Sequence, residues 1–323
     1  MDRRRFLAGL GSLAATATLP VQGKEAGVDS IFANRGRYER LSLDYVHLRI
    51  GLPKAFSALH ISDTHLAAAY PQEPEGRQKL KKAAMRVFGG RQEEALRDSL
   101  AWARDNADYV IHTGDLIDYP SEANYDLVRK YFGANVLGSV GNHEFAPDAW
   151  PDPSPNPNVA FVGQRRKALS RAYPFNVEFQ ATVANGVNFV TLDDVYGTVT
   201  ERQAAMFEAE AKKGLPIILC MHVPIYSDEI AIASYKYWMR GDWKTPSLKF
   251  TSASVPEPNK TRRAQMEDSV TREFVAALRS ERLLKAILVG HEHFSMRDVF
   301  SPTACQYIVG GNFMFHGREF LFS

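Results

Sequence analysis

Leu59-His60-Ile61-Ser62-Asp63-Thr64-His65-Leu66 closes an apolar run that begins at Ala55 and predicts a buried strand. Asp63 and His65 come where this strand ends, and residues two apart on a strand point the same way. A carboxylate oxygen beside an imidazole nitrogen suits zinc, iron or manganese. On its own an Asp-x-His pair is more often a capped loop, so a metal site requires the pattern to recur.

The pattern recurs after further apolar runs of the chain. Side chains of metal-ligand type follow five such runs: Asp63 and His65, Asp115, Asn142 with His143, His222, and His291 with His293. Any one of them has an ordinary interpretation as a loop residue or a core histidine, but structure alone does not explain five of nine histidines in such places. Gly114, Gly141 and Gly290 are expected to let the backbone turn sharply there. The set predicts one shared metal centre.

Helical periodicity alternates with these strands and predicts an α/β fold. In such folds ligands collect beyond the carboxyl ends of the strands. An alternating pattern over 38–50 predicts a half-buried edge strand, and Ala-Asn-Gly between 175–182 and 187–192 predicts a hairpin. The expected helices cover 79–106 (split at Gly89-Gly90), 121–132 (with Ser121 as N-cap), 164–172, 200–213 and 263–282.

The motifs, taken together, resemble those of a known enzyme family. The ordered series Asp63-x-His65, Gly114-Asp115-x-x-Asp118, Gly141-Asn142-His143-Glu144, His222 and Gly290-His291-x-His293 resembles the calcineurin-like metallophosphoesterases. It covers nearly the whole mature chain, and it looks closest to small exported bacterial members. The resemblance implies a four-layer α-β-β-α sandwich of two mixed β-sheets flanked by helices, with the metal site at the strand C-terminal ends. Glu292 stands where many of those members have Thr, which leaves the substrate open.

The resemblance also implies two metal ions and their ligands. Asp63, His65 and His293 would hold the first ion, and Asn142, His222 and His291 the second, with Asp115 bridging. A bridging carboxylate offsets the repulsion of two cations about 3.5–4 Å apart. A hydroxide bridging them would attack phosphorus in line, while both ions neutralise the phosphoryl oxygens. Such a site accepts iron, manganese or zinc.

Two catalytic residues and two supporting residues are expected next to these ligands. By resemblance His143 faces the leaving group as general acid, with Glu144 or a nearby acid orienting it; the alternative is that His143 only supports its loop. Thr64 and Asp118 are expected to hold the ligands through hydrogen bonds. Asp193-Asp194 also follows a strand, where a loop cap is the favoured interpretation.

The segment 225–262 is aromatic and weakly patterned, which predicts a long functional loop inserted in a single domain over 30–323. Trp238, Arg240 and Trp243 are candidates for substrate binding, by stacking on a nucleobase or contacting a lipid. The alternative is that the aromatic side chains only pack against the core. Cys220 and Cys305 are predicted to be buried thiols, with a single bridge between them as the alternative.

Residues 1–23 predict an export signal and linker. Arg3-Arg4-x-Phe6-Leu7 precedes a short apolar stretch and resembles a twin-arginine signal, although Asp2 departs from the usual pattern. The stretch is too short for a transmembrane helix. We therefore expect the twin-arginine machinery as a partner, a periplasmic or extracellular location, and no membrane span in the mature protein. A basic tail on a cytoplasmic protein is the alternative.

Charge and motif content narrow the function of the 323-residue chain. A formal net charge of +2 argues against a dedicated nucleic-acid binder, which would show a clustered basic face, and no nucleotide-binding glycine pattern follows the first strand. The leading hypothesis is an exported two-metal phosphoesterase acting on a small phosphate mono- or diester. Alternatives are a pyrophosphate, nucleotide or lipid-linked diphosphate hydrolase, or a non-catalytic metal-binding scaffold, which the intact ligand set disfavours.

Overall fold

The computed structural model describes residues 39–133, 136–146, 159–195, 197–238 and 268–323. The predicted export signal, Arg240 and Trp243 lie outside these ranges, as does the start of the helix predicted over 263–282. Among the described residues no helix combines the length and the apolar character that crossing a membrane requires. Both cysteines are free thiols; Cys220 is buried as predicted, whereas Cys305 is partly exposed.

The first sheet contains five strands in the order β1-β11-β2-β3-β4. They are β1 (Ser42–Leu48), β2 (Phe56–Ile61), β3 (Tyr109–Thr113), β4 (Val136–Ser139) and β11 (His316–Phe322). β2, β3 and β4 run parallel to one another, whereas β11 is antiparallel to β2. β1 forms the edge, which confirms the edge strand predicted over 38–50.

The second sheet contains six strands in the order β5-β6-β7-β8-β10-β9. They are β5 (Phe179–Ala184), β6 (Val187–Leu192), β7 (Ile217–Cys220), β8 (Leu284–Val289), β9 (Met296–Val299) and β10 (Cys305–Ile308). β5 and β6 form the predicted antiparallel hairpin. β6, β7, β8 and β10 are parallel, so this sheet is mixed like the first.

The helices largely follow the predicted pattern. They are α3 (Glu75–Val87), α4 (Gln92–Asn106), α5 (Glu122–Tyr131), α6 (Val159–Leu169), α7 (Glu201–Ala211), α8 (Asp228–Trp238) and α9 (Ser269–Ser280), with short 3-10 helices η2 (His143–Phe145) and η3 (Asn312–Met314). Ser121 caps α5, because its side chain accepts a hydrogen bond from the backbone N–H of Asn124. Two predictions were wrong. α6 begins five residues before the predicted start at 164, and part of the segment 225–262, predicted to be a loop, forms the helix α8.

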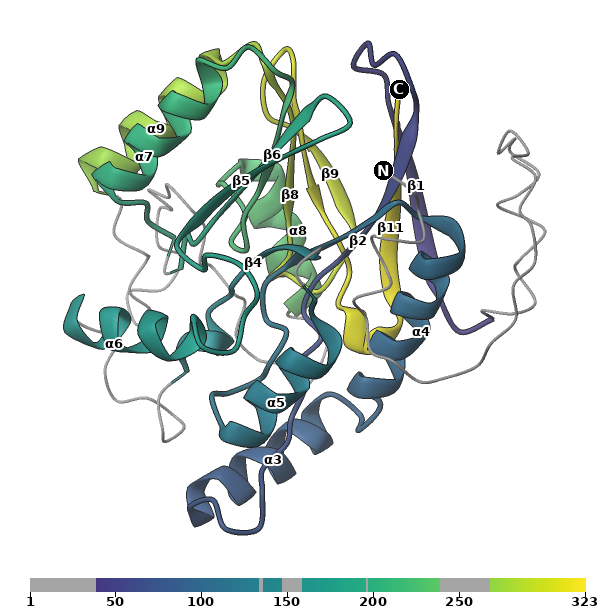
Figure 1. The fold of residues 1–323 in the computed structure, drawn as a ribbon, viewed down its shortest axis with the longest axis vertical. Coiled ribbons are helices and arrows are strands. Elements are labelled where there is room, and N and C mark those ends of the chain that lie inside the picture. Colours follow the sequence, from purple (N-terminus) through teal and green to yellow (C-terminus); the bar gives the residue numbers. More distant parts are fainter. Residues whose placement is uncertain (1–38, 134–135, 147–158, 196, 239–267) are drawn as a thin grey trace.

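Three clusters of buried side chains separate four layers. On β2, Ala58 faces the second sheet whereas Leu59 faces the helices, because successive strand residues point to opposite sides. On β7, Ile218 faces the first sheet and Leu219 packs with side chains of α7 and α9. In Figure 1, α7 and α9 lie side by side next to the second sheet, with α4 and α5 beside the first. The predicted helix–sheet–sheet–helix sandwich is confirmed.

The loops after β2, β3, β4, β7 and β8 meet at one edge of the sandwich. The backbone N–H of Asp63 donates to the carbonyl of Gly114 at 3.0 Å, and that of Gly290 donates to the carbonyl of His222 at 3.1 Å. The two sheets are joined by the N–H of His291, which donates to the Asp63 carboxylate at 2.9 Å. The polar strand ends predicted from sequence therefore form one cluster.

Candidate metal centre

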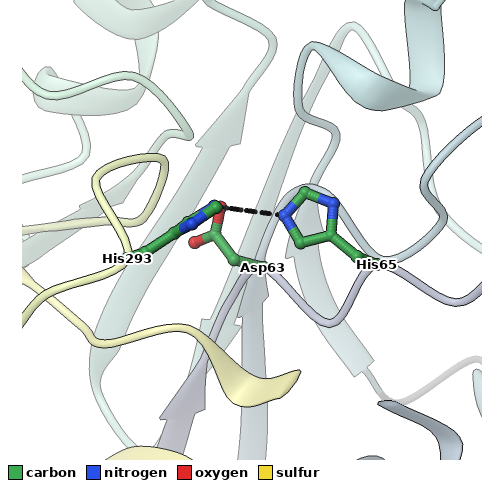
Figure 2. A group of neighbouring side chains, drawn as sticks. All are labelled: Asp63, His65 and His293. Atoms are coloured by element: carbon green, nitrogen blue, oxygen red, sulfur yellow. Dashed lines mark hydrogen bonds and ion pairs between the residues drawn. The ribbon is translucent and has the colours of Figure 1, made fainter. Parts of the chain in front are cut away.

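The first group of candidate ligands comprises Asp63, His65 and His293. Figure 2 shows the two imidazole rings pointing toward each other with the Asp63 carboxylate beside them. The Nε2 atoms of His65 and His293 are 3.1 Å apart, and His293 Nε2 is 3.4 Å from Asp63 Oδ1. Residues separated by 228 positions in the chain thus converge on one point.

The second group comprises Asp115, His222 and His291, whose ligand atoms all lie within 4.8 Å of one another. Asn142 belongs beside them, because its Oδ1 is 3.2 Å from His222 Nε2. Asp115 Oδ2 is 3.3 Å from His222 Nε2 and 3.9 Å from His65 Nε2. Asp115 therefore lies between the two groups.

These spacings fit a coordination sphere. With bonds of about 2.1 Å, two ligand atoms at octahedral or tetrahedral angles lie about 3.0–3.4 Å apart. The His65–His293 and His293–Asp63 separations fall at these values. Both carboxylates are buried: burial tends to raise the pKa of Asp63 and of Asp115, but the neighbouring histidines His293 and His222 lower both. Two ionised carboxylates in a buried cluster favour a cation.

In His65 and His222, a hydrogen bond to Nδ1 leaves Nε2 as the ring nitrogen that can bind a metal ion. His222 Nδ1 donates to the carbonyl of Thr113 at 2.7 Å, and His65 Nδ1 lies 3.2 Å from Asp118 Oδ1. Nε2 of each ring is therefore the atom that faces the centre. Burial and the charge of His143 lower the pKa of His65, which keeps it neutral, as ligation requires. Burial also acts to lower the pKa of His222, but Asp115 raises it to about 10, so a cation binding there displaces a proton.

The ligand loops adopt an unusual backbone. Seven non-glycine residues of the described chain have positive φ, and five of them are candidate ligands: Asp63, His65, Asp115, His291 and His293. Left-handed backbone costs about 1–2 kcal/mol at each such residue. Strain of this kind concentrates at functional sites, where the surrounding structure imposes it.

The three predicted glycines serve two different needs. Only Gly114 has positive φ, at +94°, and an added Cβ there would lie 2.6 Å from His222 Nδ1. At Gly141 an added Cβ would lie 2.2 Å from Asp115 Oδ1, and at Gly290 1.9 Å from the Ser62 hydroxyl. The prediction of sharp turns was thus wrong for Gly141 and Gly290, where the backbone approaches the buried ligand shell too closely for a side chain.

His143 is the most exposed of the candidate catalytic groups, with 23% of its side chain accessible. Its Nδ1 is 2.9 Å from both the carboxylate and the carbonyl oxygen of Asp118. Burial tends to lower its pKa, but Asp115 and Asp118 raise it to about 10. His143 also lies within 4.8 Å of His65 and Asp115, so its imidazole borders the centre.

Glu144 occupies a different place from the one predicted. Its buried carboxylate accepts hydrogen bonds from the backbone N–H groups of Asp115 at 3.0 Å, Leu116 at 2.8 Å and Gly141 at 2.7 Å, and from the Tyr173 hydroxyl at 2.7 Å. The acid that contacts His143 is Asp118 instead. Glu144 thus holds the Asp115 loop against the Asn142 loop, a long-range role that sequence spacing does not reveal.

Further buried groups hold the remaining loops. Thr64 contacts His112 Nε2 at 3.0 Å and donates to Asn312 Oδ1 at 3.1 Å, so its hydrogen bonds go to buried neighbours of the centre and not to the candidate ligands that it was predicted to hold. Asp194 accepts from the backbone N–H groups of His222 at 3.0 Å and Val223 at 3.2 Å. The predicted loop cap after β6 is confirmed, and the loop it caps is the one that presents His222.

An aromatic wall, made of Phe88, Phe313 and Trp238, surrounds the first ligand group. Phe88 stacks on His65 with ring centroids 4.1 Å apart, and Phe313 and Trp238 each lie 5.2 Å from His293. Sequence reasoning missed Phe88 and Phe313, which follow no motif.

Gly114→Ala tests whether the close approach at Gly114 positions His222. The matched control is Gly214→Ala, because Gly214 also has positive φ (+74°) but no atom within 4 Å of an added Cβ. Gly214→Ala should lose about 1–2 kcal/mol of unfolding free energy, and Gly114→Ala should lose more, because its Cβ would also overlap His222 and the Gly141 backbone. Only Gly114→Ala should also weaken Mn²⁺ binding, by about ten-fold or more. Urea unfolding and calorimetric titration measure the two effects, and equal Mn²⁺ affinity in both variants would contradict this account.

Comparison with solved structures gives weak matches of low sequence identity. A dimetal phosphatase from Danio rerio matches with 14% identity and a TM-score of 0.40, covering 80% of this chain and 88% of that chain. A 5'-nucleotidase from Candida albicans matches with 13% identity and a TM-score of 0.38, covering 84% and 47%. A calcineurin-like phosphoesterase, YfkN from Bacillus subtilis, matches with 12% identity and a TM-score of 0.34, covering 80% and 82%. No curated protein matches the sequence.

The comparison with family models gives a clear result. The calcineurin-like phosphoesterase model matches residues 56–295, which is more than half of the chain and includes every candidate ligand from Asp63 to His293. Members of this family are metal-dependent hydrolases, as the clustered ligand groups of this chain also indicate. The chain belongs to the calcineurin-like phosphoesterase family.

Proposed function

We propose that the chain is an exported two-metal phosphoesterase that hydrolyses a small phosphate mono- or diester. The observation that carries this proposal is the position of Asp115. Its Oδ2 lies 3.3 Å from a nitrogen of the second ligand group and 3.9 Å from one of the first. A carboxylate shared in this way suits two neighbouring cations rather than one.

We assign the ions to the two ligand groups described above, with Asp63, His65 and His293 holding one, Asn142, His222 and His291 the other, and Asp115 shared. When bound, iron, manganese or zinc ions would supply Lewis acidity toward water and the phosphoryl oxygens. The protein's own contribution is to aim Nε2 of His65 and His222 inward, which the Nδ1 hydrogen bonds of both rings support.

His143 is proposed as the general acid. Its Nδ1 proton is held by Asp118, which leaves Nε2 to give a proton to the oxygen of the departing alcohol. The raised pKa supports a protonated imidazole at neutral pH, although cations on Asp115 would weaken that part of the effect. Asp118 serves both His143 and His65, so one carboxylate aligns the acid and a metal ligand.

Of the three proposed substrate-binding residues, the structure describes only Trp238. Trp238 lies against His293 with its indole buried, so it suits a wall of the first ion site better than an open stacking surface. Arg240 and Trp243 stay proposed substrate contacts outside the described residues. The alternative substrates, pyrophosphate or nucleotide-linked diphosphates, use the same centre.

Asp115→Asn tests the shared carboxylate. Asparagine keeps the shape but not the charge, so turnover of nitrophenyl phosphate should fall about 100-fold or more. The number of ions per chain, measured by elemental analysis, should fall below two. Dialysis against a chelator should abolish activity of the parent, and adding back manganese, zinc or iron should restore it.

Asp108→Asn is the matched control, because Asp108 precedes the same strand and accepts from the Ser57 N–H at its opposite end. This variant should keep both ions and parental turnover. An Asp115→Asn protein with two ions and parental activity would overturn the two-metal proposal.

His143→Gln tests the general acid through the leaving group. A poor leaving group needs a proton more than a good one does, so loss of turnover should reach about 10²–10⁴-fold on phenyl phosphate and stay much smaller on nitrophenyl phosphate. His47→Gln, at the edge strand β1, is the control and should change neither rate. Equal losses on both substrates would reject the acid role and favour the alternative of loop support.

Export is tested by replacing the arginine pair. Changing Arg3 and Arg4 together to lysine should leave the protein uncleaved in the cytoplasm of a bacterium with a twin-arginine system, whereas Arg5→Lys should still be exported. Cell fractionation and N-terminal sequencing give the readout. An intact N-terminus on cytoplasmic parental protein would contradict export.

A further inference from the structure

Glu292 is a buried carboxylate that the proposed chemistry does not use. It lies between His291 and His293 and is fully inaccessible to solvent. Its Oε2 accepts hydrogen bonds from the Ser234 hydroxyl at 2.6 Å and from the Trp238 indole N–H at 3.0 Å. Within the part of the chain that the structure describes, its Oε1 has no hydrogen-bond partner. A buried carboxylate is costly to keep, so its two bonds to one helix require an explanation.

Both hydrogen-bond donors lie on the same face of α8. Ile230, Ser234 and Trp238 are the buried residues of this helix and are spaced four apart, so they form one stripe. Ile230 packs in the core beneath the second sheet, whereas Ser234 and Trp238 both bond to Glu292. Glu292 therefore holds two residues in the second half of α8.

The same end of α8 borders the first ligand group. The Trp238 ring lies 5.2 Å from the His293 ring, and the neighbouring Tyr237 ring lies 5.2 Å from that of Phe294. His293 has positive φ (+61°) and 12% side-chain exposure, so its loop is strained and only partly enclosed. The Trp238 ring is one of several groups around this imidazole, which also contacts His65, Asp63 and Phe313.

We propose that Glu292 is a positioning residue: it holds α8 against the ligand loop through Ser234 and Trp238, and thereby fixes the His293 ring beside Asp63. The inference rests on the proposed function, since it concerns the same ion site. It makes the binding of the first ion depend on a helix that contributes no ligand.

Glu292→Gln and Glu292→Ala test whether the hydrogen bonds of Glu292 to Ser234 and Trp238 hold α8. Glutamine keeps a carbonyl oxygen that accepts from Ser234 and Trp238, and its NH₂ takes the place of the unpaired Oε1. Alanine keeps neither bond. In the alanine variant, amide hydrogen exchange over 228–238 should be about ten-fold faster or more. The affinity for one of two Mn²⁺ ions should fall about 10–100-fold, whereas the glutamine variant should stay within about three-fold of the parent.

Trp238→Phe and Ser234→Ala test the same two hydrogen bonds by removing their donors on α8. Each variant removes one donor, so each should show part of the faster exchange and weaker Mn²⁺ binding expected of Glu292→Ala. Trp238→Phe does so while keeping a ring next to His293. If Glu292→Ala does not fold, these two variants decide the question. Trp102→Phe is the control for losing a buried indole in another core and should leave exchange over α8 unchanged.

Parental exchange and Mn²⁺ affinity in Glu292→Ala would overturn the inference, as would a glutamine variant as impaired as the alanine variant. Failure of the proposed function looks different. A parent protein that binds no Mn²⁺ would remove the two-metal proposal, while exchange over α8 would still report whether Glu292 holds the helix.

Discussion

The structure depends on placing two buried carboxylates, Asp63 and Asp115, close together at one edge of the sandwich. Two such charges repel, and burial raises the cost of each. Imidazoles from both sheets surround them: His293 lies 3.4 Å from Asp63 and His222 lies 3.3 Å from Asp115. A buried cluster of carboxylates and imidazoles favours metal binding, and the sandwich is the frame that sets the spacing of the candidate ligands.

The loops that carry the ligands are strained, and buried side chains hold them in place. Glu144 accepts hydrogen bonds from the backbone N–H groups of Asp115 and Gly141, and Asp194 accepts one from the N–H of His222. These carboxylates gain charge-assisted hydrogen bonds from backbone that has no ladder partner. Acids that are not themselves candidate ligands thus hold the loops in which five candidate ligands have left-handed backbone.

Much of the fold and the ligand set could be predicted from sequence because each strand and the polar residue at its end are local signals. The succession of strands along the chain, the split at Gly89-Gly90 and the cap at Ser121 belong to this class, whereas the order of strands within each sheet does not. The role of Glu144, the aromatic contact of Phe88 with His65, and the close approach at Gly290 depend on residues far apart in the chain. α8 was missed because its buried face is half polar, and the acceptor for that face lies over fifty residues away.

The most direct test of the account is anomalous diffraction from crystals of the protein loaded with manganese or zinc. Two peaks about 3.5–4 Å apart, with the Asp115 carboxylate contacting both and His293 contacting one, would agree with a shared two-metal centre. A single peak, or two peaks of which Asp115 contacts only one, would contradict it.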